Sequence, residues 1–376
     1  MGGLAVRRPP SLPQTDPGCQ MADSRRGFLG QALATVGLAA LNPHVYAGGG
    51  QGKIKVGQIG TTHAHASKLE VFRDSAEYEV VGVVEPSEER RTLAKGERAY
   101  RDLPWLTREQ LLETAGLQLV LVETAVCDLL DNASACIDAG KHVHLDKPAG
   151  ESLPQFSRIL QEAERRNLLV QLGYMYRYNP GIVMLREFLK AGWLGEIFEV
   201  HAVMSKVVDP RSRAGLADYR GGIFFELGCH ITDLVLGVLG EPDRITSFPR
   251  QAARGHDSLL DNMLAVFEYP VATASLKSSG VEVDGGARRH LVVCGTQGTF
   301  EVQPLDNPRV ELVLDRTRGT FAAGRQVVEL PRYTRYVDDA RDLARVIRGE
   351  QSPLFSHAHE LAVQKAVLQA CALPLT

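Results

Sequence analysis

Three ionisable side chains recur at helical spacing in one otherwise apolar stretch of the chain. If this stretch is helical from about residue 225, Glu226, His230 and Asp233 fall at positions i, i+4 and i+7 and share one face. Polar groups among apolar neighbours are costly unless they face a pocket or pair with one another. A carboxylate four residues before an imidazole can orient the ring and raise its basicity, as a general base requires. The spacing therefore predicts a catalytic stripe. The alternative is an internal cap with a hydrogen-bonded core histidine.

Lys147 is the candidate partner of this stripe. It follows an apolar run at residues 141–145, where a strand would leave a sheet, and open α/β sheets hold ligands at that edge. Pro148 disfavours a helical backbone at Lys147, so we expect an extended residue whose amine points into the crevice. A solvated surface lysine is the competing interpretation.

The turn after the first apolar run could bind a nucleotide. Dinucleotide-binding sheets place GxGxxG at this point, and this chain keeps Gly60 but lacks the second and third glycines. Gly60 can make the tight turn, whereas the missing glycines would let the backbone approach a pyrophosphate. A helix N-terminus could still hold an anion, with the hydroxyls of Thr61 and Thr62 as further donors. We therefore expect a modified nucleotide site.

Glu85 ends the second apolar run, 25 positions after Gly60. An acid at roughly this spacing bonds the adenosine ribose hydroxyls and repels a 2′-phosphate. This interpretation favours NAD over NADP. The alternative is that Glu85 only begins the polar helix start at residues 86–89.

His63 and His65 allow an interpretation from another class of enzyme. A His-x-His pair at the C-terminal end of a strand, with His and Asp downstream, occurs in barrel-type metal-dependent hydrolases. Such a barrel needs eight βα units, whereas this chain stops alternating after about five. The pairs at residues 142/144 and 357/359 repeat the spacing without obvious acidic partners, which is typical of ordinary core or surface histidines. We assign no metal ligand from the sequence.

The order of apolar segments indicates how these residues are positioned. Apolar runs at 53–59, 78–84, 117–122 and 141–145 alternate with helical patterns, which predicts a doubly wound parallel sheet of the α/β class. After Tyr178 the strands alternate in polarity, which indicates an α+β domain with an open, mostly antiparallel sheet. The strands expected in this second domain span residues 197–207, 263–269, 272–278, 290–295, 298–302 and 310–314.

Several motifs together resemble one family. One is similar to the family's AGKHVxxEKP, with Asp146 in place of Glu, and another matches GxHxxD around His230. Two more are similar to the segment that opens the family's second domain and to its later GTxGT turn. The four motifs stand at residues 139–148, 228–233, 173–180 and 293–299. On these motifs, and over residues 53–370, the sequence resembles the glucose-fructose oxidoreductase and inositol dehydrogenase family, Gfo/Idh/MocA.

The resemblance implies an NAD-binding Rossmann domain followed by an open sheet that binds a sugar or polyol and often forms an oligomer surface. It implies that Lys147 bonds the reacting hydroxyl and lowers its pKa, while His230 accepts the proton as hydride leaves for the nicotinamide. Glu226 stands where the family often has Asp, and Leu129 where many relatives carry His. The catalytic residues expected are Lys147, His230, Glu226 and Asp233. The cofactor contacts expected are Gly60, Thr61, Thr62, His63, Glu85, Thr124, Asp146 and Lys147. The substrate contacts expected are Tyr176, Arg177 and His230.

Residues 1–47 are typical of a twin-arginine export signal. Arg25 and Arg26 precede a modestly apolar run at residues 29–41, and Ala47 fits a small-residue cleavage site. The alternative is a chance arginine pair before a short amphipathic helix. The run is too short and too rich in Gly and Ala to span a bilayer stably. We expect a periplasmic protein without a stable membrane span once the signal is removed, started at either Met1 or Met21.

Length and composition limit the remaining possibilities. The chain has 376 residues, enough for two domains, and its net charge of −3 provides no basic field for nucleic acid. Six cysteines without a CxxC pair cannot form a disulfide framework or a structural zinc site of the usual spacing. The expected parts are a signal peptide (1–47), a linker (48–52), an NAD(P)-binding Rossmann domain (53–172) and a substrate-binding and oligomerisation domain (173–376) whose C-terminal helix could pack back on the first.

We therefore predict an exported, homo-oligomeric NAD-linked oxidoreductase that acts on a sugar or polyol hydroxyl. Two alternatives stay open. One is an NAD-dependent glycosidase or lyase that oxidises a sugar hydroxyl transiently. The other is a catalytically degraded sugar-binding protein of the same fold.

Overall fold

Five short apolar segments of the first half pair into one parallel sheet. A computed structural model describes residues 52–217, 219–253 and 257–376, so the predicted signal peptide and most of the linker lie outside the described residues. The strand order is β2-β1-β3-β4-β5. The strands are β1 (Ile54–Ile59), β2 (Tyr78–Val84), β3 (Leu117–Val122), β4 (His142–Leu145) and β5 (Val170–Leu172). The order reverses between β1 and β3, and open α/β sheets bind ligands at such a point.

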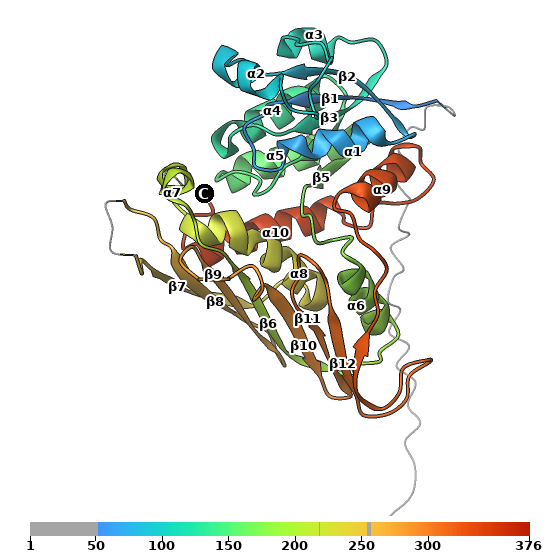
Figure 1. Cartoon of the computed structure of the whole chain (residues 1–376), viewed down its shortest axis with the longest axis vertical. Helices are drawn as coiled ribbons and strands as arrows, with labels where there is room; N and C mark the ends of the chain where they lie inside the picture. Colours follow the sequence, from blue (N-terminus) through green and yellow to red (C-terminus); the bar gives the residue numbers. More distant parts are fainter. Residues whose placement is uncertain (1–51, 218, 254–256) are drawn as a thin grey trace, which may run out of the picture. The chain divides into compact units, whose positions relative to one another are not determined.

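Helices connect these strands (Figure 1). They are η1 (Ala66–Lys68), α1 (Leu69–Asp74), α2 (Glu88–Ala94), α3 (Arg108–Leu112), α4 (Val126–Asp138) and α5 (Leu153–Arg165). The two longest, α4 and α5, each bury an apolar stripe. Side-chain caps define several of the starts, since Ser87, Thr107 and Ser152 each accept a hydrogen bond from a backbone N–H in the first turn. The helix after β1 starts later than a Rossmann turn requires, because residues 61–65 form a loop before η1.

The second half forms an eight-stranded sheet in the order β13-β12-β11-β10-β6-β9-β8-β7. Neighbours are antiparallel except for β6 and β9, which are parallel. The strands are β6 (Ile197–Ser205), β7 (Arg244–Arg250), β8 (Asn262–Glu268), β9 (Thr273–Ser279), β10 (His290–Gly295), β11 (Gly298–Val302), β12 (Val310–Leu314) and β13 (Gly324–Val328). Alternate residues of β8 are buried, as expected for a sheet with one covered face. The two edge strands, β7 and β13, were not predicted from the sequence.

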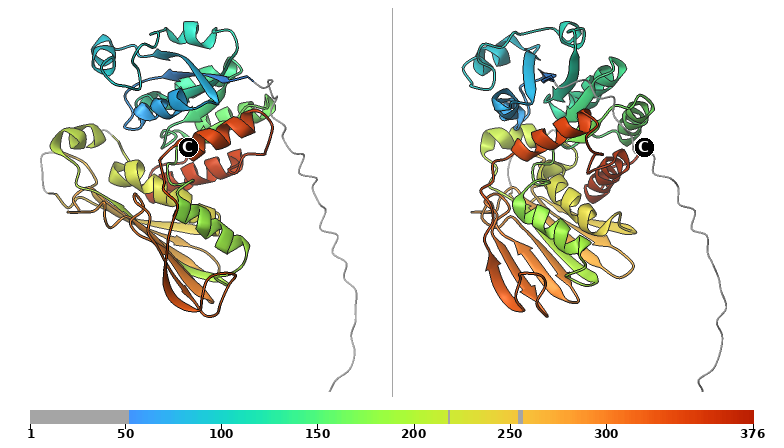
Figure 2. Two further views of the ribbon diagram at one scale, coloured as in Figure 1. Left: turned by 45° about the vertical axis from the view of Figure 1, so that its right-hand side comes forward. Right: turned by 90° about the vertical axis from the view of Figure 1, so that its right-hand side faces the viewer.

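Helices α6 (Pro180–Lys190) and α8 (Cys229–Leu239) pack against one face of this sheet, and Figure 2 shows both on the same side. The C-terminal helix also contacts β7 and β8. The remaining helical elements are α7 (Pro210–Ala217), the π-helical turn η2 (Phe224–Gly228), α9 (Val337–Ile347) and α10 (His357–Ala370). The last helix is bonded to the parallel sheet, because the Leu172 N–H donates to Glu360 Oε1 at 3.1 Å. All described residues fall within one compact unit.

The predicted fold class is confirmed: a doubly wound parallel sheet precedes a domain with a mostly antiparallel sheet. None of the helices in the described ranges is long and apolar enough to cross a membrane. The parallel strands are buried along nearly their whole length, which explains their continuous apolar sequences.

Candidate active site

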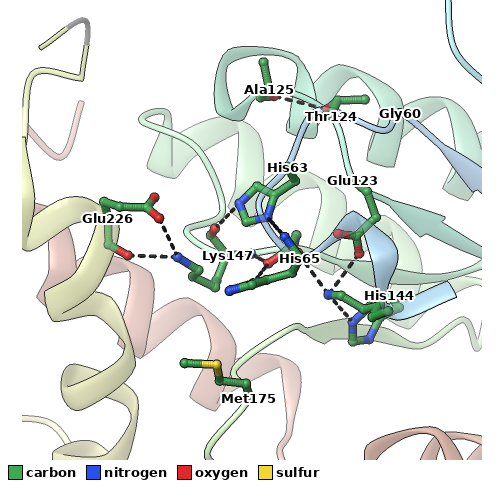
Figure 3. A network of polar contacts seen from close by, with 12 residues as sticks. Gly60, His63, His65, Glu123, Thr124, Ala125, His144, Lys147, Met175 and Glu226 are labelled. Atoms are coloured by element: carbon green, nitrogen blue, oxygen red, sulfur yellow. Dashed lines mark hydrogen bonds and ion pairs between the residues drawn. The ribbon is translucent and has the colours of Figure 1, made fainter. Parts of the chain in front are cut away.

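Polar side chains from four segments meet at the carboxyl end of the parallel sheet (Figure 3). His63 and His65 come from the loop after β1, and Glu123 directly follows β3. Lys147 lies just beyond β4, and Glu226 lies on the π-helical turn η2. The fold therefore brings residues that are far apart in the sequence to the edge where such sheets bind ligands.

Asp146 is the centre of this cluster. Its Oδ1 accepts from the Lys147 backbone N–H at 2.6 Å and lies 3.3 Å from His65 Nδ1. Its Oδ2 lies 2.9 Å from both Lys68 Nζ and His63 Nδ1. Burial alone would raise the pKa of Asp146, but His63 and Lys68 hold the pKa well below its ordinary value. The carboxyl is therefore an anion at neutral pH.

Lys68 and Glu123 extend the cluster from Asp146. Neither residue was predicted from the sequence. Lys68 Nζ lies 3.0 Å from Glu123 Oε1 and 3.2 Å from His144 Nε2. Burial would lower the pKa of Lys68, yet Asp146 and Glu123 raise it. Burial and the nearby Asp146 carboxylate raise the pKa of Glu123 well above its ordinary value. Glu123 could have been found, because it follows an apolar strand as Glu85 does, whereas Lys68 looks like any helix lysine.

Lys147 and Glu226 form a buried ion pair. Lys147 Nζ donates to the Glu226 carbonyl oxygen at 2.8 Å and to its Oε1 at 3.2 Å. Burial would lower the pKa of Lys147, but the Glu226 carboxylate raises it above the ordinary lysine value. The same pair lowers the pKa of Glu226, although burial opposes this shift. The side chain of Lys147 is 1% exposed, so this ammonium is held inside the protein.

His230 lies beside this pair in a buried aromatic setting. Its ring centroid is 5.9 Å from that of His65 and 5.5 Å from that of Tyr176. Its Nδ1 has no hydrogen-bond partner among the described residues. Burial first, and then the Lys147 ammonium, lower the pKa of His230 well below its ordinary value, so the imidazole is neutral.

The prediction that Glu226 orients His230 within a stripe with Asp233 is wrong. Glu226 bonds Lys147 and does not orient His230. The reason is the π-helical turn η2, in which hydrogen bonds run from residue i to i+5 and the face rotates relative to an α-helix. Asp233 lies one turn further on, where its Oδ1 accepts from Arg177 at 2.6 Å.

Arg177 and Tyr176, the expected substrate contacts, are buried and bonded to protein groups. Arg177 is 1% exposed and makes a second ion pair with Glu360 at 2.6 Å. The Tyr176 hydroxyl donates to Asp306 Oδ1 at 2.7 Å, while the ring packs against His230. Arg177 is therefore engaged in a structural cluster, and Tyr176 packs its ring against His230.

A cleft of about 860 Å³ lies at the carboxyl ends of β1, β2 and β3. Gly60, Thr62, Glu85 and Thr124 are among its lining residues. Gly60 has φ +89°, and a Cβ there would lie 2.7 Å from the Glu123 carbonyl oxygen, so only glycine suits this turn. The cleft sits at the reversal of strand order, where the adenosine half of a dinucleotide would bind.

The other nucleotide features are altered. The Thr61 hydroxyl donates to Glu85 Oε2 at 2.7 Å, and the Thr61 N–H donates to the same oxygen at 3.0 Å. Thr61 is therefore tied to Glu85 and not directed at an anion. No helix begins directly after Gly60, because α1 starts at Leu69, so the usual helix N-terminus for a pyrophosphate is lacking there. The residues present fit the adenosine half of NAD and alter the contacts to its phosphates.

A doubly wound nucleotide-binding sheet followed by an open antiparallel sheet, with a lysine at their junction, defines a dehydrogenase-like class. Residues 54–174 match the model of the oxidoreductase family with an NAD-binding Rossmann fold, and residues 182–301 match the Gfo/Idh/MocA C-terminal domain. Together the models match more than half of the chain. The protein belongs to the Gfo/Idh/MocA family.

Two curated relatives and one solved structure illustrate the similarity. Myo-inositol 2-dehydrogenase of Thermotoga maritima is 27% identical over 194 residues, which cover 50% of this chain and 54% of that protein. Scyllo-inositol 2-dehydrogenase (NADP(+)) of Bacillus subtilis is 22% identical over 58% of each chain. The matched segments thus span little more than half the length of these relatives. An NAD binding oxidoreductase from Klebsiella pneumoniae shares the fold with a TM-score of 0.75 at 14% identity, covering 85% of this chain and 97% of that one.

Proposed function

We propose that this protein is an exported NAD-linked oxidoreductase that transfers hydride between the nicotinamide and a hydroxyl-bearing carbon of a sugar or polyol. The single observation that carries the proposal is that Lys147 and His230, 83 positions apart in the sequence, belong to one buried polar cluster at the carboxyl end of the parallel sheet. The Lys147 ammonium is near enough to His230 to contribute to its lowered pKa. A cationic donor beside a neutral imidazole suits the oxidation of a hydroxyl group.

In this proposal the two side chains divide the proton chemistry. Lys147 directs an N–H at the substrate oxygen, which stabilises the negative charge that develops there. His230, which is neutral, accepts the hydroxyl proton. Glu226 keeps Lys147 protonated and holds its amine in place through two contacts. NAD supplies the hydride acceptor when it is bound.

The cleft residues would hold the adenosine part of the cofactor. Gly60 allows the backbone to approach, and Glu85 is retained at the end of β2 with 6% of its surface exposed. Its carboxylate would repel a 2′-phosphate, which supports NAD over NADP. One relative's name specifies NADP(+), so the preference for NAD rests on Glu85 and not on the relatives.

A polyol substrate is supported by the names of the two relatives, which are inositol dehydrogenases. Lys147 is 1% and His230 2% exposed, so a substrate must displace neighbouring side chains to reach them. Twin-arginine export, the periplasmic location and a homo-oligomer assembled through the open face of the second sheet are parts of the same proposal, derived from the sequence and the family.

A sugar-binding protein that has lost redox activity is the second candidate. It is favoured by one observation, the bonding of Thr61 to Glu85 in a turn that lacks its helix. An NAD-dependent glycosidase or lyase, which oxidises a sugar hydroxyl only transiently, would keep the same residues.

The test is to identify the cofactor in purified full-length protein. Denaturation should release NAD into the supernatant, where mass spectrometry detects it. Calorimetry on cofactor-free protein should show NAD binding. Myo-inositol and a panel of aldoses should then reduce the bound cofactor, seen as nicotinamide absorbance. Protein that neither contains nor binds NAD would contradict the proposal and favour the sugar-binding candidate. Turnover without net reduced cofactor would favour the glycosidase or lyase.

A further inference from the structure

Two imidazoles and one carboxylate converge in a way that the acid–base proposal leaves unexplained. We propose that His63 Nδ1, His65 Nδ1 and the Asp146 carboxylate bind one divalent transition-metal ion. The three ligand atoms lie within 4.8 Å of one another, and no other group of three such residues in the described ranges meets this condition. The inference does not rest on the proposed redox activity.

The distances suit ligands that share one ion. Atoms bound to a metal at about 2.1 Å lie roughly 3.0 Å apart at a right angle and roughly 3.4 Å apart at a tetrahedral angle. His63 Nδ1 lies 2.9 Å from Asp146 Oδ2, and His65 Nδ1 lies 3.3 Å from Asp146 Oδ1. Hydrogen bonds would have similar lengths, so the arrangement of protons must decide between the two.

The contacts of His63 favour a cation. Its Nε2 lies 3.0 Å from the Lys147 carbonyl oxygen, which only accepts, so Nε2 carries the N–H. In the neutral ring Nδ1 then has a lone pair, and it accepts from the His65 backbone N–H at 3.3 Å. The same lone pair faces Asp146 Oδ2, another acceptor, at 2.9 Å. Two acceptors this close need a proton or a metal ion between them. A backbone carbonyl that fixes the outer nitrogen is also the usual support of a metal-binding histidine.

Charged side chains surround the three ligand atoms. The Asp146 and Glu226 carboxylates are paired with the Lys68 and Lys147 ammonium groups. A metal ion binds deprotonated ligands, so it would displace protons from this cluster. Asp146 Oδ2 also contacts Lys68, so the ion would share that oxygen's charge with the ammonium.

The ligand set specifies the class of ion. Two imidazoles and one carboxylate suit first-row transition metals such as Zn²⁺, Fe²⁺ or Co²⁺, whereas Ca²⁺ and Mg²⁺ prefer oxygen ligands throughout. Three protein ligands leave positions for water or a substrate oxygen, as in catalytic metal sites. His230, with its unpartnered buried Nδ1, has its ring 5.9 Å from that of His65.

The experiment uses full-length protein whose purification tag has been removed, stripped with a chelator and titrated with Co²⁺. We expect one Co²⁺ per chain by calorimetry, with a visible absorption spectrum typical of nitrogen and oxygen ligands. His63→Gln and His65→Gln should each weaken binding by on the order of 100-fold, at least the loss seen for changes to outer-shell partners. His201→Gln is the matched control, because His201 is a half-exposed histidine on β6 that bonds Ser275.

Circular dichroism of the metal-free variants checks that they are folded. If a variant fails to fold, electron paramagnetic resonance of the wild-type protein loaded with Cu²⁺ replaces it, and coupling to two imidazole nitrogens is expected. A wild-type chain that binds no Co²⁺ above background, or binding unchanged in both folded variants, would overturn the inference. So would a spectrum without histidine nitrogen coupling.

Discussion

Burial and charge pairing oppose each other at Lys147. Removal from water alone would deprotonate this amine, and the Glu226 carboxylate more than compensates. The outcome is a cation held in an almost dry site, where a hydrogen bond to a substrate oxygen would be stronger than in water. The pair also shows why Glu226 matters although it does not contact His230.

Glu226→Gln should move the alkaline limit of activity to lower pH. Without the carboxylate, burial dominates and the pKa of Lys147 falls, so the ammonium is lost at lower pH. We expect the alkaline limb of the kcat profile, measured with any polyol that the wild type oxidises, to move down by about one pH unit or more. Glu226→Asp should restore part of the shift. An unchanged alkaline limb would show that Glu226 does not control Lys147.

At the scale of single elements, the π-helical turn η2 decides which residue meets Lys147. The turn presents the Glu226 carbonyl and carboxylate to one amine and rotates the following helix. Gly228 permits it, because a Cβ at Gly228 would lie 2.5 Å from Cγ of the buried Phe224 ring. Such turns often occur at functional sites.

Gly228→Ala should therefore destabilise the protein and impair the site. The new methyl group must push the Phe224 ring or the backbone, which costs about 1–3 kcal/mol in a packed core. Gly237→Ala is the control on α8, because a Cβ there meets nothing within 4 Å, and alanine in a helix should be neutral or stabilising by up to about 1 kcal/mol. Urea unfolding of both variants measures the difference. Equal stabilities would remove the argument for strain at Gly228.

Asp339, in the first turn of α9, is a buried carboxyl group with a raised pKa. Asp339 Oδ2 has no hydrogen-bond partner in the described structure, and burial raises the pKa of Asp339 to about 7. The unfolded chain releases this proton near pH 4. Between these values the native state binds the extra proton, so the stability that it contributes falls as pH rises from about 4 to about 7.

Asp339→Asn should remove this dependence. We expect the variant to match the wild type near pH 4 and to exceed it at pH 8, with a difference on the order of 4 kcal/mol. Asp338→Asn is the comparison in the same turn, because that exposed side chain pairs with Arg341 at 2.5 Å and should change stability by less than about 1 kcal/mol. Thermal unfolding at several pH values tests the pair. A variant less stable than the wild type at pH 8 would contradict the pKa shift.

At the scale of the whole molecule, one buried arginine joins both halves of the described chain. Arg177 follows β5 and pairs with Asp233 on α8 and Glu360 on α10. Glu360 also accepts from the backbone of β5, and the guanidinium lies 3.9 Å from the Phe355 ring centroid. The C-terminal helix is thereby bonded to the parallel sheet and to a helix of the second domain.

Arg177→Met should be among the most damaging changes in the protein. It leaves two buried carboxylates without their cation, which typically costs 3–5 kcal/mol. Arg325→Met is the matched control, since Arg325 pairs with Glu311 on the exposed edge of the second sheet and should cost at most about 1 kcal/mol. Urea midpoints compare the two variants. A loss below 1 kcal/mol for Arg177→Met would show that the cluster can rearrange.

Much of the fold followed from local pattern. The continuous apolar runs that became β1, β3 and β4 are buried on both faces, and the alternating run of β8 is buried on one, so the pattern of apolar residues indicated each kind of sheet. The edge strands β7 and β13 escaped because their outward positions are polar and their burial is partial. The loop of residues 61–65 delays the helix after β1, which in a GxGxxG turn would start sooner.

The sequence by itself determined the fold class, the family resemblance and the importance of Lys147 and His230, because these depend on periodicity and on short motifs. Only the tertiary structure decided the partners. It assigned Glu226 to Lys147 through a π-helical turn, paired Asp233 with Arg177, and placed two histidines against Asp146. These pairings join segments tens of residues apart, and the energy of a buried charge depends on its neighbours in space, which spacing along the chain does not specify.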